Sequence, residues 1–230
     1  MGSNYSKAFK AFVSPFGAFM VLLALGSLVE YAFKGSTSLL VTATRYWVFP
    51  LQTLVCGIIV ARFWGAYSFG KVREIGFTIA IAVLVLALWI SPQVVLHLPP
   101  RLVGFDPTLF SYNPALLSGV LGMRFLRLVI VVPLMEEIFW RGFLLRDFID
   151  NEDFTKVPFG TYTRNSCLFV AIAFALAHWG PDFIPALITG ALYNWVAYRT
   201  RSLASCVVAH SITNLLLGVY IMETKQWGFW

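Results

Sequence analysis

Long apolar runs recur along the whole chain and limit what it can fold into. Each approaches the roughly 20 residues that an α-helix needs to cross a bilayer. Charged residues make up 12% of the 230 residues, whereas a soluble domain has roughly one quarter. The sequence therefore predicts an all-α fold, a polytopic transmembrane helical bundle. About seven spans are expected: Phe12–Ala32, Arg45–Arg62, Glu74–Ser91, Arg124–Leu145, Asn165–Trp179, Phe183–Tyr198 and Ser202–Met222.

The chain has no repeat, low-complexity tract or long linker that would divide it. We therefore expect a single integral membrane domain over residues 1–230. Residues 1–115 would hold the N-terminal spans and an interfacial segment, and residues 116–222 would form a C-terminal core. The segment Ser91–Pro114 contains five prolines and cannot be one helix. We interpret the first apolar run as an anchor, because it lacks the small-residue cleavage site of a signal peptide.

The basic residues are distributed over many predicted span ends. The net charge is +6, yet no basic patch suggests nucleic acid as a partner. With a cytoplasmic N-terminus, eleven basic residues fall on the inner side and six on the outer side, which the positive-inside rule favours. The three cysteines all lie within predicted spans and form no metal-type or disulfide pattern, so we interpret them as apolar packing residues.

One predicted span, within "VVPLMEEIFWRGFLL", contains three charged residues. A charged side chain near the centre of a membrane helix costs ~2.5–3.5 kcal/mol on insertion scales. Glu137 and Arg141 are four residues apart, share a helix face and can form an ion pair. Glu136 projects about 100° away from Glu137 and is left without this partner. The alternative is that both glutamates only brace the bundle.

Two further spans carry polar residues at helical spacing. "FALAHW" places Phe174 four residues before His178, and "AHSITN" places His210 four residues before Asn214. Because polar side chains are costly in lipid, we expect Glu136, the two histidines and Asn214 to converge on one interior cavity. The alternatives are a histidine that only packs and an interhelical polar clamp.

These four side chains could carry out hydrolysis. A buried glutamate can act as a general base, and His178 could hold the attacking water. His210 and Asn214 could both donate hydrogen bonds to an oxyanion, worth ~2.7–4 kcal/mol per donor. Two histidines and a glutamate could also bind zinc, although the HExxH signature is absent. We expect no metal and no cofactor, and the spacing alone leaves zinc open.

The motifs EExxxR ("EEIFWR"), FxxxH ("FALAH") and HxxxN ("HSITN"), in this order, resemble the CPBP family. This family comprises CAAX-protease-like and bacteriocin-processing intramembrane enzymes, including the Rce-type prenyl-protein endopeptidases. The resemblance covers roughly residues 124–216. It implies a glutamic endopeptidase without a catalytic metal, and it makes residues 116–222 the catalytic core.

The resemblance also implies a role for each motif residue. Glu136 and His178 would activate water, and His210 and Asn214 would form the oxyanion hole. Supporting positions would be Glu137, Arg141 and Phe174.

The chain departs from the family pattern just before the last motif. Its sequence there is "TRSLASCVVAH", with Arg201 where family members often have glycine, and the chain is shorter than a typical prenyl-protein endopeptidase. We therefore favour a bacterial enzyme of the myxosortase-like branch that removes a C-terminal sorting tail. The acidic loop Arg146–Arg164 could receive the basic end of such a tail.

This hypothesis places the chain in the bacterial inner (cytoplasmic) membrane with a cytoplasmic N-terminus. Its partners would be the lipid bilayer and a membrane-anchored protein substrate with a C-terminal tail. The alternatives are a CAAX-type prenyl-protein endopeptidase and, from other classes, a proton-coupled transporter or a non-catalytic scaffold.

Overall fold

The computed structural model describes residues 3–230, and helices form its whole framework, with no strand in this range. The predicted all-α class is confirmed. Five helices are long and apolar enough to cross a membrane: Tyr5–Ala32, Thr44–Arg62, Ile75–Val94, Pro114–Asp147 and Leu203–Thr224.

The α-helices vary from single turns to long rods. They are α1 (Ser3–Ala32), α2 (Leu39–Thr42), α3 (Thr44–Arg62), α4 (Ile75–Val94), α5 (Pro114–Phe125), α6 (Val132–Glu137), α7 (Leu145–Asp147), α8 (Arg164–Ala177), α9 (Phe183–Thr200) and α10 (Leu203–Thr224). Short 3₁₀ turns occupy Trp64–Ala66, Pro107–Phe110, Phe154–Lys156 and Trp227–Phe229.

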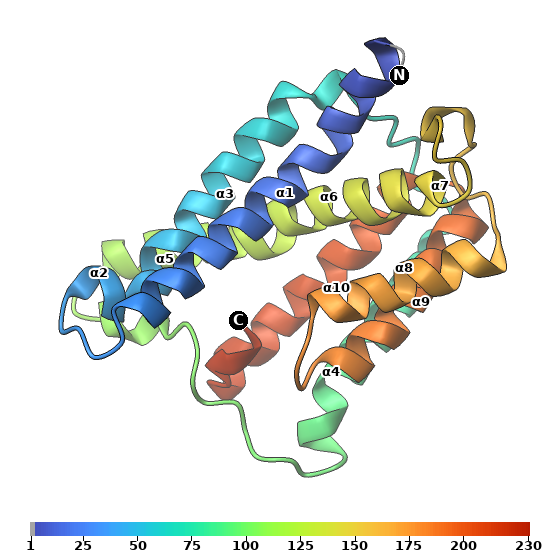
Figure 1. Cartoon of the computed structure of the whole chain (residues 1–230). Coiled ribbons are helices and arrows are strands. Elements are labelled where there is room, and N and C mark those ends of the chain that lie inside the picture. The colour runs from blue at the N-terminus through green and yellow to red at the C-terminus, as the bar shows by residue number, and fades with distance from the viewer. Residues whose placement is uncertain (1–2) are drawn as a thin grey trace.

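The helix Pro114–Asp147 is one continuous rod that runs from α5 through α6 to α7. In Figure 1, α1 and α3 lie side by side along one side of this rod, and α4, α8, α9 and α10 gather on the other. The rod is therefore the central element of the bundle, and it carries both glutamates of the first motif.

Two of the seven predicted spans do not qualify as membrane-crossing helices. Helix α8 has 14 residues, fewer than the roughly 17–25 of a spanning helix. Helix α9 has 18 residues but is not apolar enough to count among the five. Half of its residues are buried, so α9 is largely an interior helix, and its polar residues contact protein instead of lipid.

The predicted start of the fourth span was wrong. The helix begins at Pro114, ten residues before Arg124, and the Asn113 side chain caps it by accepting hydrogen bonds from the backbone N–H groups of Ala115 and Leu116. The prediction took Arg124 as an end-of-span charge on the outer side. The structure instead buries Arg124 within the helix at 3% exposure.

Two π-helical segments, Leu126–Val131 and Ile138–Leu144, flank α6 within the rod. Pro133 lies at the start of α6 and has no N–H to donate, which favours a break in the regular α-helical ladder. Single-turn π segments occur frequently at functional sites. Here they bracket the two glutamates.

Small residues bring α8 and α9 close together. A Cβ atom added at Gly190 would lie 3.0 Å from the Cα atom of Ala171 and 3.3 Å from the Cβ atom of Phe174. Ala186, one turn earlier, is fully buried. These small residues therefore allow the two helices to pack closely.

Candidate active site

The ion pair predicted from the first motif is present and fully buried. Arg141 Nη1 donates to Glu137 Oε1 at 3.0 Å, and neither side chain is exposed. The guanidinium also donates from Nε to Asn194 Oδ1 at 3.2 Å and from Nη2 to the Gly190 carbonyl at 3.1 Å. The pair is thus held by α9 as well.

Glu137 has a second partner that the sequence did not predict. His210 Nδ1, on α10, lies 2.9 Å from Glu137 Oε1, the same oxygen that accepts from Arg141. A carboxylate only accepts, so Nδ1 carries the proton and Nε2 is left free. Glu137 therefore orients His210 as well as neutralising Arg141.

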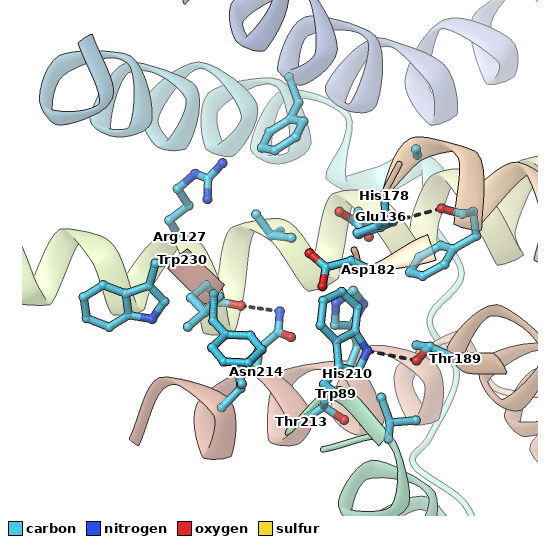
Figure 2. A pocket seen from close by; sticks show the side chains of 18 of the residues that line it. Trp89, Arg127, Glu136, His178, Asp182, Thr189, His210, Thr213, Asn214 and Trp230 are labelled. Atoms are coloured by element: carbon cyan, nitrogen blue, oxygen red, sulfur yellow. Dashed lines mark hydrogen bonds between the residues drawn. The ribbon is translucent and has the colours of Figure 1, made fainter. Parts of the chain in front are cut away.

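Glu136 differs sharply from its neighbour in the sequence. It is 6% exposed, and its Oε2 atom has no hydrogen-bond partner among the described residues. It lines a cavity of about 320 Å³ together with His178, His210 and Asn214. Figure 2 shows these side chains around the cavity. The structure thus brings all four candidate catalytic residues together, from α6, the end of α8 and α10.

His178 immediately follows α8 and is held by the last turn of that helix. Its Nδ1 atom lies 2.9 Å from the Phe174 carbonyl oxygen, which only accepts, so Nδ1 carries the proton and Nε2 is free. The Phe174 ring lies 4.5 Å from the imidazole, centroid to centroid, and the Arg141 guanidinium carbon is 5.1 Å from the same ring. Phe174 thereby connects His178 to the ion pair.

Asn214 is held by a carbonyl group that the π-helical segment leaves free. The Val132 N–H donates to the Arg127 carbonyl, five residues back. In the same pattern the Leu128 carbonyl would pair with residue 133, which is proline and has no N–H. Asn214 Nδ2 donates to the Leu128 carbonyl at 2.9 Å instead. The second hydrogen of that amide stays available.

Sequence reasoning missed several residues of this cavity. Trp89 packs edge-on against His178, with ring centroids 5.9 Å apart, and its indole N–H donates to Thr189 Oγ1 at 3.0 Å.

Tyr193 is a second such residue. Its ring centroid lies 5.2 Å from that of His210, and its hydroxyl donates to Thr213 Oγ1 at 2.8 Å. A polar period-four pattern in α9, Thr189–Tyr193, is the only signal that could have indicated an interior face there. Asp182 and Arg127 also line the cavity.

The geometry defines a class of site. A buried carboxylate oxygen without a partner, two oriented imidazoles and an amide donor can activate water and bind an oxyanion. Among residues 3–230 no group of three or more His, Cys, Asp or Glu side chains is placed to hold a metal ion. The protein is thus an all-helical membrane protein with a hydrolase-type cavity in its interior.

Comparison with protein families identifies the chain further. Residues 118–216, from α5 to α10, match the family described as type II CAAX prenyl endopeptidase Rce1-like, and this part of the chain is similar to that family. The match to this family suggests a membrane-embedded protease that acts on membrane proteins. No curated protein and no solved structure matches the chain.

Proposed function

We propose that this protein is an intramembrane endopeptidase that cleaves membrane-anchored proteins near their C-terminal end by means of water activated by Glu136. The observation that carries the proposal is the buried, unpartnered Oε2 atom of Glu136, which lines one cavity with the free nitrogens of two histidines. Glu137 also has a buried Oε2 atom without a hydrogen-bond partner among residues 3–230, but its Oε1 atom pairs with Arg141 and His210, whereas Glu136 forms no such ion pair in this range.

In the proposed reaction, water hydrogen-bonds to Glu136 and to the free Nε2 atom of His178. Glu136 takes a proton from the water as its oxygen attacks the scissile carbonyl carbon. Asn214, through its second amide hydrogen, and His210, through Nε2 when its ring is protonated, donate to the oxyanion. The intermediate collapses with cleavage of the C–N bond, and Glu136 returns the proton to the leaving amine.

For the substrate, we propose a C-terminal sorting tail that ends in basic residues. The loop between α7 and α8 carries Asp150, Glu152 and Asp153 at or near the surface. Hydrogen bonds from Thr155 hold the pKa of the Asp153 carboxyl below its usual range, so this residue stays charged. The loop can therefore attract a basic tail. The family description favours a second candidate, a prenylated CAAX protein.

The test compares C-terminal peptides, by mass spectrometry, from membranes of cells that contain the wild type, Glu136→Gln or Glu223→Gln. Glu136→Gln keeps the shape of the side chain but removes the base, and we expect cleavage to slow by ~10²–10⁴-fold. Intact C-terminal tails should accumulate in that strain. Their sequences would show whether they are basic sorting tails or CAAX ends.

Glu223→Gln is the matched control, because Glu223 is exposed at the end of α10 and lies outside the cavity. It should cleave at the wild-type rate. Unchanged tails in a folded Glu136→Gln protein would overturn the proteolytic function, and transport assays would follow.

A further inference from the structure

A second cavity, of about 290 Å³, lies between α3, α5 and the 3₁₀ turn Pro107–Phe110, and it is lined by the buried Arg124 and the partly buried Arg127. Arg124 and Arg127 are three residues apart on the central rod, and both line this cavity. The remaining lining is mostly apolar, and it includes Phe49, Phe110 and Leu116. Nothing in the proposed catalytic reaction uses Arg124.

The two guanidinium groups lack the partners that buried cations usually have. No carboxylate lies within ion-pair distance of Arg124 or Arg127 in the described part of the chain. The Nε and Nη1 atoms of Arg124 and the Nε atom of Arg127 have no hydrogen-bond partner among residues 3–230. Arg127 Nη2 donates to Gln52 Oε1 at 3.1 Å. Buried charges without a partner are rare, because their desolvation is not compensated.

Aromatic rings supply most of the contacts that these arginines do make. The Arg124 guanidinium carbon lies 4.7 Å from the Phe49 ring centroid and 5.3 Å from that of Trp230. The Arg127 guanidinium carbon also lies close to Phe49, 4.5 Å from the centroid of its ring. Such contacts attract cations but leave the N–H groups free. The planar guanidinium is well suited to bind phosphate oxygens in a bidentate manner.

We propose that Arg124 and Arg127 bind the phosphate group of an anionic phospholipid. The volume of the cavity lies just below the ~300–1,000 Å³ range of ligand pockets, which suits a head group and not a whole lipid. Exposed apolar side chains on the same rod, Leu116, Leu126 and Ile130, can contact the acyl chains outside it. Basic pockets between membrane helices are known to bind phospholipid head groups.

The position of the cavity also favours a lipid. Tyr46 lines it, and Trp230 contacts Arg124. Tyrosine and tryptophan concentrate at the depth of the head groups in membrane proteins. The asparagine-capped start of the rod at Pro114 lies at this same end.

The substrate is a less suitable occupant, because this cavity contains none of the four candidate catalytic residues. Of the residues that line the two cavities, Arg127 is the one that they share. In Figure 2, Arg127 lies at one end of the catalytic cavity, and Glu136 and His178 lie toward the other. A lipid phosphate held by both arginines would therefore lie beside the catalytic cavity without occupying it, and Arg127 would connect the two.

The test measures lipid retained by the purified full-length protein. The protein is placed in nanodiscs of phosphatidylcholine with or without phosphatidylglycerol, released, and analysed by native mass spectrometry. We expect the wild type to retain phosphatidylglycerol in preference to phosphatidylcholine. Arg124→Gln should lower this retention about tenfold or more, as the loss of charge-assisted hydrogen bonds predicts. Arg45→Gln, which removes an exposed charge at the start of α3, should retain the lipid.

A second pair of variants tests the cavity without altering charge. Gly119 lines the cavity, and a Cβ atom added there meets nothing within 4 Å, so Gly119→Leu should fill the space without disturbing the fold. A Cβ atom at Gly122 also meets nothing, but Gly122 lies outside both cavities. Gly119→Leu should lose the lipid, and Gly122→Leu should keep it.

Three results would overturn the proposal. The first is equal retention of the two lipids by the wild type, or unchanged retention in both Arg124→Gln and Gly119→Leu. The second is complete displacement of the lipid by millimolar inorganic phosphate, which would indicate a site for free phosphate. The third concerns Arg124→Gln: unchanged lipid retention, together with a raised KM for a peptide substrate that has a free C-terminal carboxylate. The KM for the same peptide with a C-terminal amide would be unchanged. Because lipid retention is measured without substrate, its result does not depend on the proposed proteolysis.

Discussion

The two ends of the rod Pro114–Asp147 both bury arginine, but they treat its charge in opposite ways. Arg141, in the second half, donates to a carboxylate, an amide oxygen and a backbone carbonyl. Arg124, in the first half, has aromatic rings around it and two nitrogens without a partner. The same contrast separates Glu137 from Glu136. In this protein a paired buried charge supports the structure, whereas an unpaired one marks a site where a ligand or a reaction is expected.

The largest effect that we expect from this contrast is on stability at Arg141. Arg141→Met should leave the Glu137 carboxylate buried with His210 as its remaining partner, and breaking such a pair costs ~3–5 kcal/mol. Unfolding of the purified protein by denaturant in detergent would measure the loss. A variant as stable as the wild type would show that the pair does not brace the bundle.

The next effect is on catalysis at Asn214. Asn214→Leu removes the proposed oxyanion donor, and turnover should fall by ~10²–10³-fold, equivalent to ~2.7–4 kcal/mol. The KM should change little, since the donor acts in the transition state. The bond to the Leu128 carbonyl is lost as well, so the unfolding free energy of the variant is the control. A raised KM with unchanged kcat would assign Asn214 to substrate binding.

Arg124→Met sharpens the comparison, because the same substitution as at Arg141 should have the opposite result. Replacing an unpaired buried charge with an apolar side chain of similar length is often neutral or stabilising by ~1–4 kcal/mol. We expect no loss of unfolding free energy in detergent free of anionic lipid. A loss as large as that of Arg141→Met would mean that the aromatic rings alone compensate the charge of Arg124.

The smallest effect concerns Arg201, the residue that departs from the family pattern. It ends α9 in the left-handed conformation, with φ of 48°, where glycine is favoured. Arg201→Gly should relieve a strain of about 1–2 kcal/mol, partly offset by the greater freedom of glycine in the unfolded chain. We expect a small gain in the unfolding midpoint and unchanged cleavage. A loss of stability would show that the contact of the arginine stem with Gly160 outweighs the strain.

Predictions that depend on spacing within one helix were accurate. The pairing of Glu137 with Arg141 follows from the four-residue period of the α-helix and is confirmed. The roles of Glu136, His178, His210 and Asn214 stay predictions until activity is measured. The orientation of the N-terminus and the substrate likewise stay predictions.

Predictions that used charge as a boundary marker were less accurate. Arg124 was taken as the start of a span, but the helix begins at Pro114 and buries Arg124. Helices α8 and α9 were taken as spans because they are apolar, but α8 is too short and α9 is not apolar enough to count among the five membrane-crossing helices. Hydropathy by itself does not distinguish burial in protein from burial in lipid.

The sequence by itself determined the helical membrane fold, the family motifs and which of the two glutamates would be paired. Hydropathy and helical periodicity are local properties, and a reader of the sequence can apply them directly. Only the tertiary structure decided that Glu137 also orients His210, that Asn214 completes the ladder at Pro133, and that Arg124 has no acidic partner among residues 3–230. These facts depend on contacts between residues as many as 86 positions apart, which packing of the whole bundle sets.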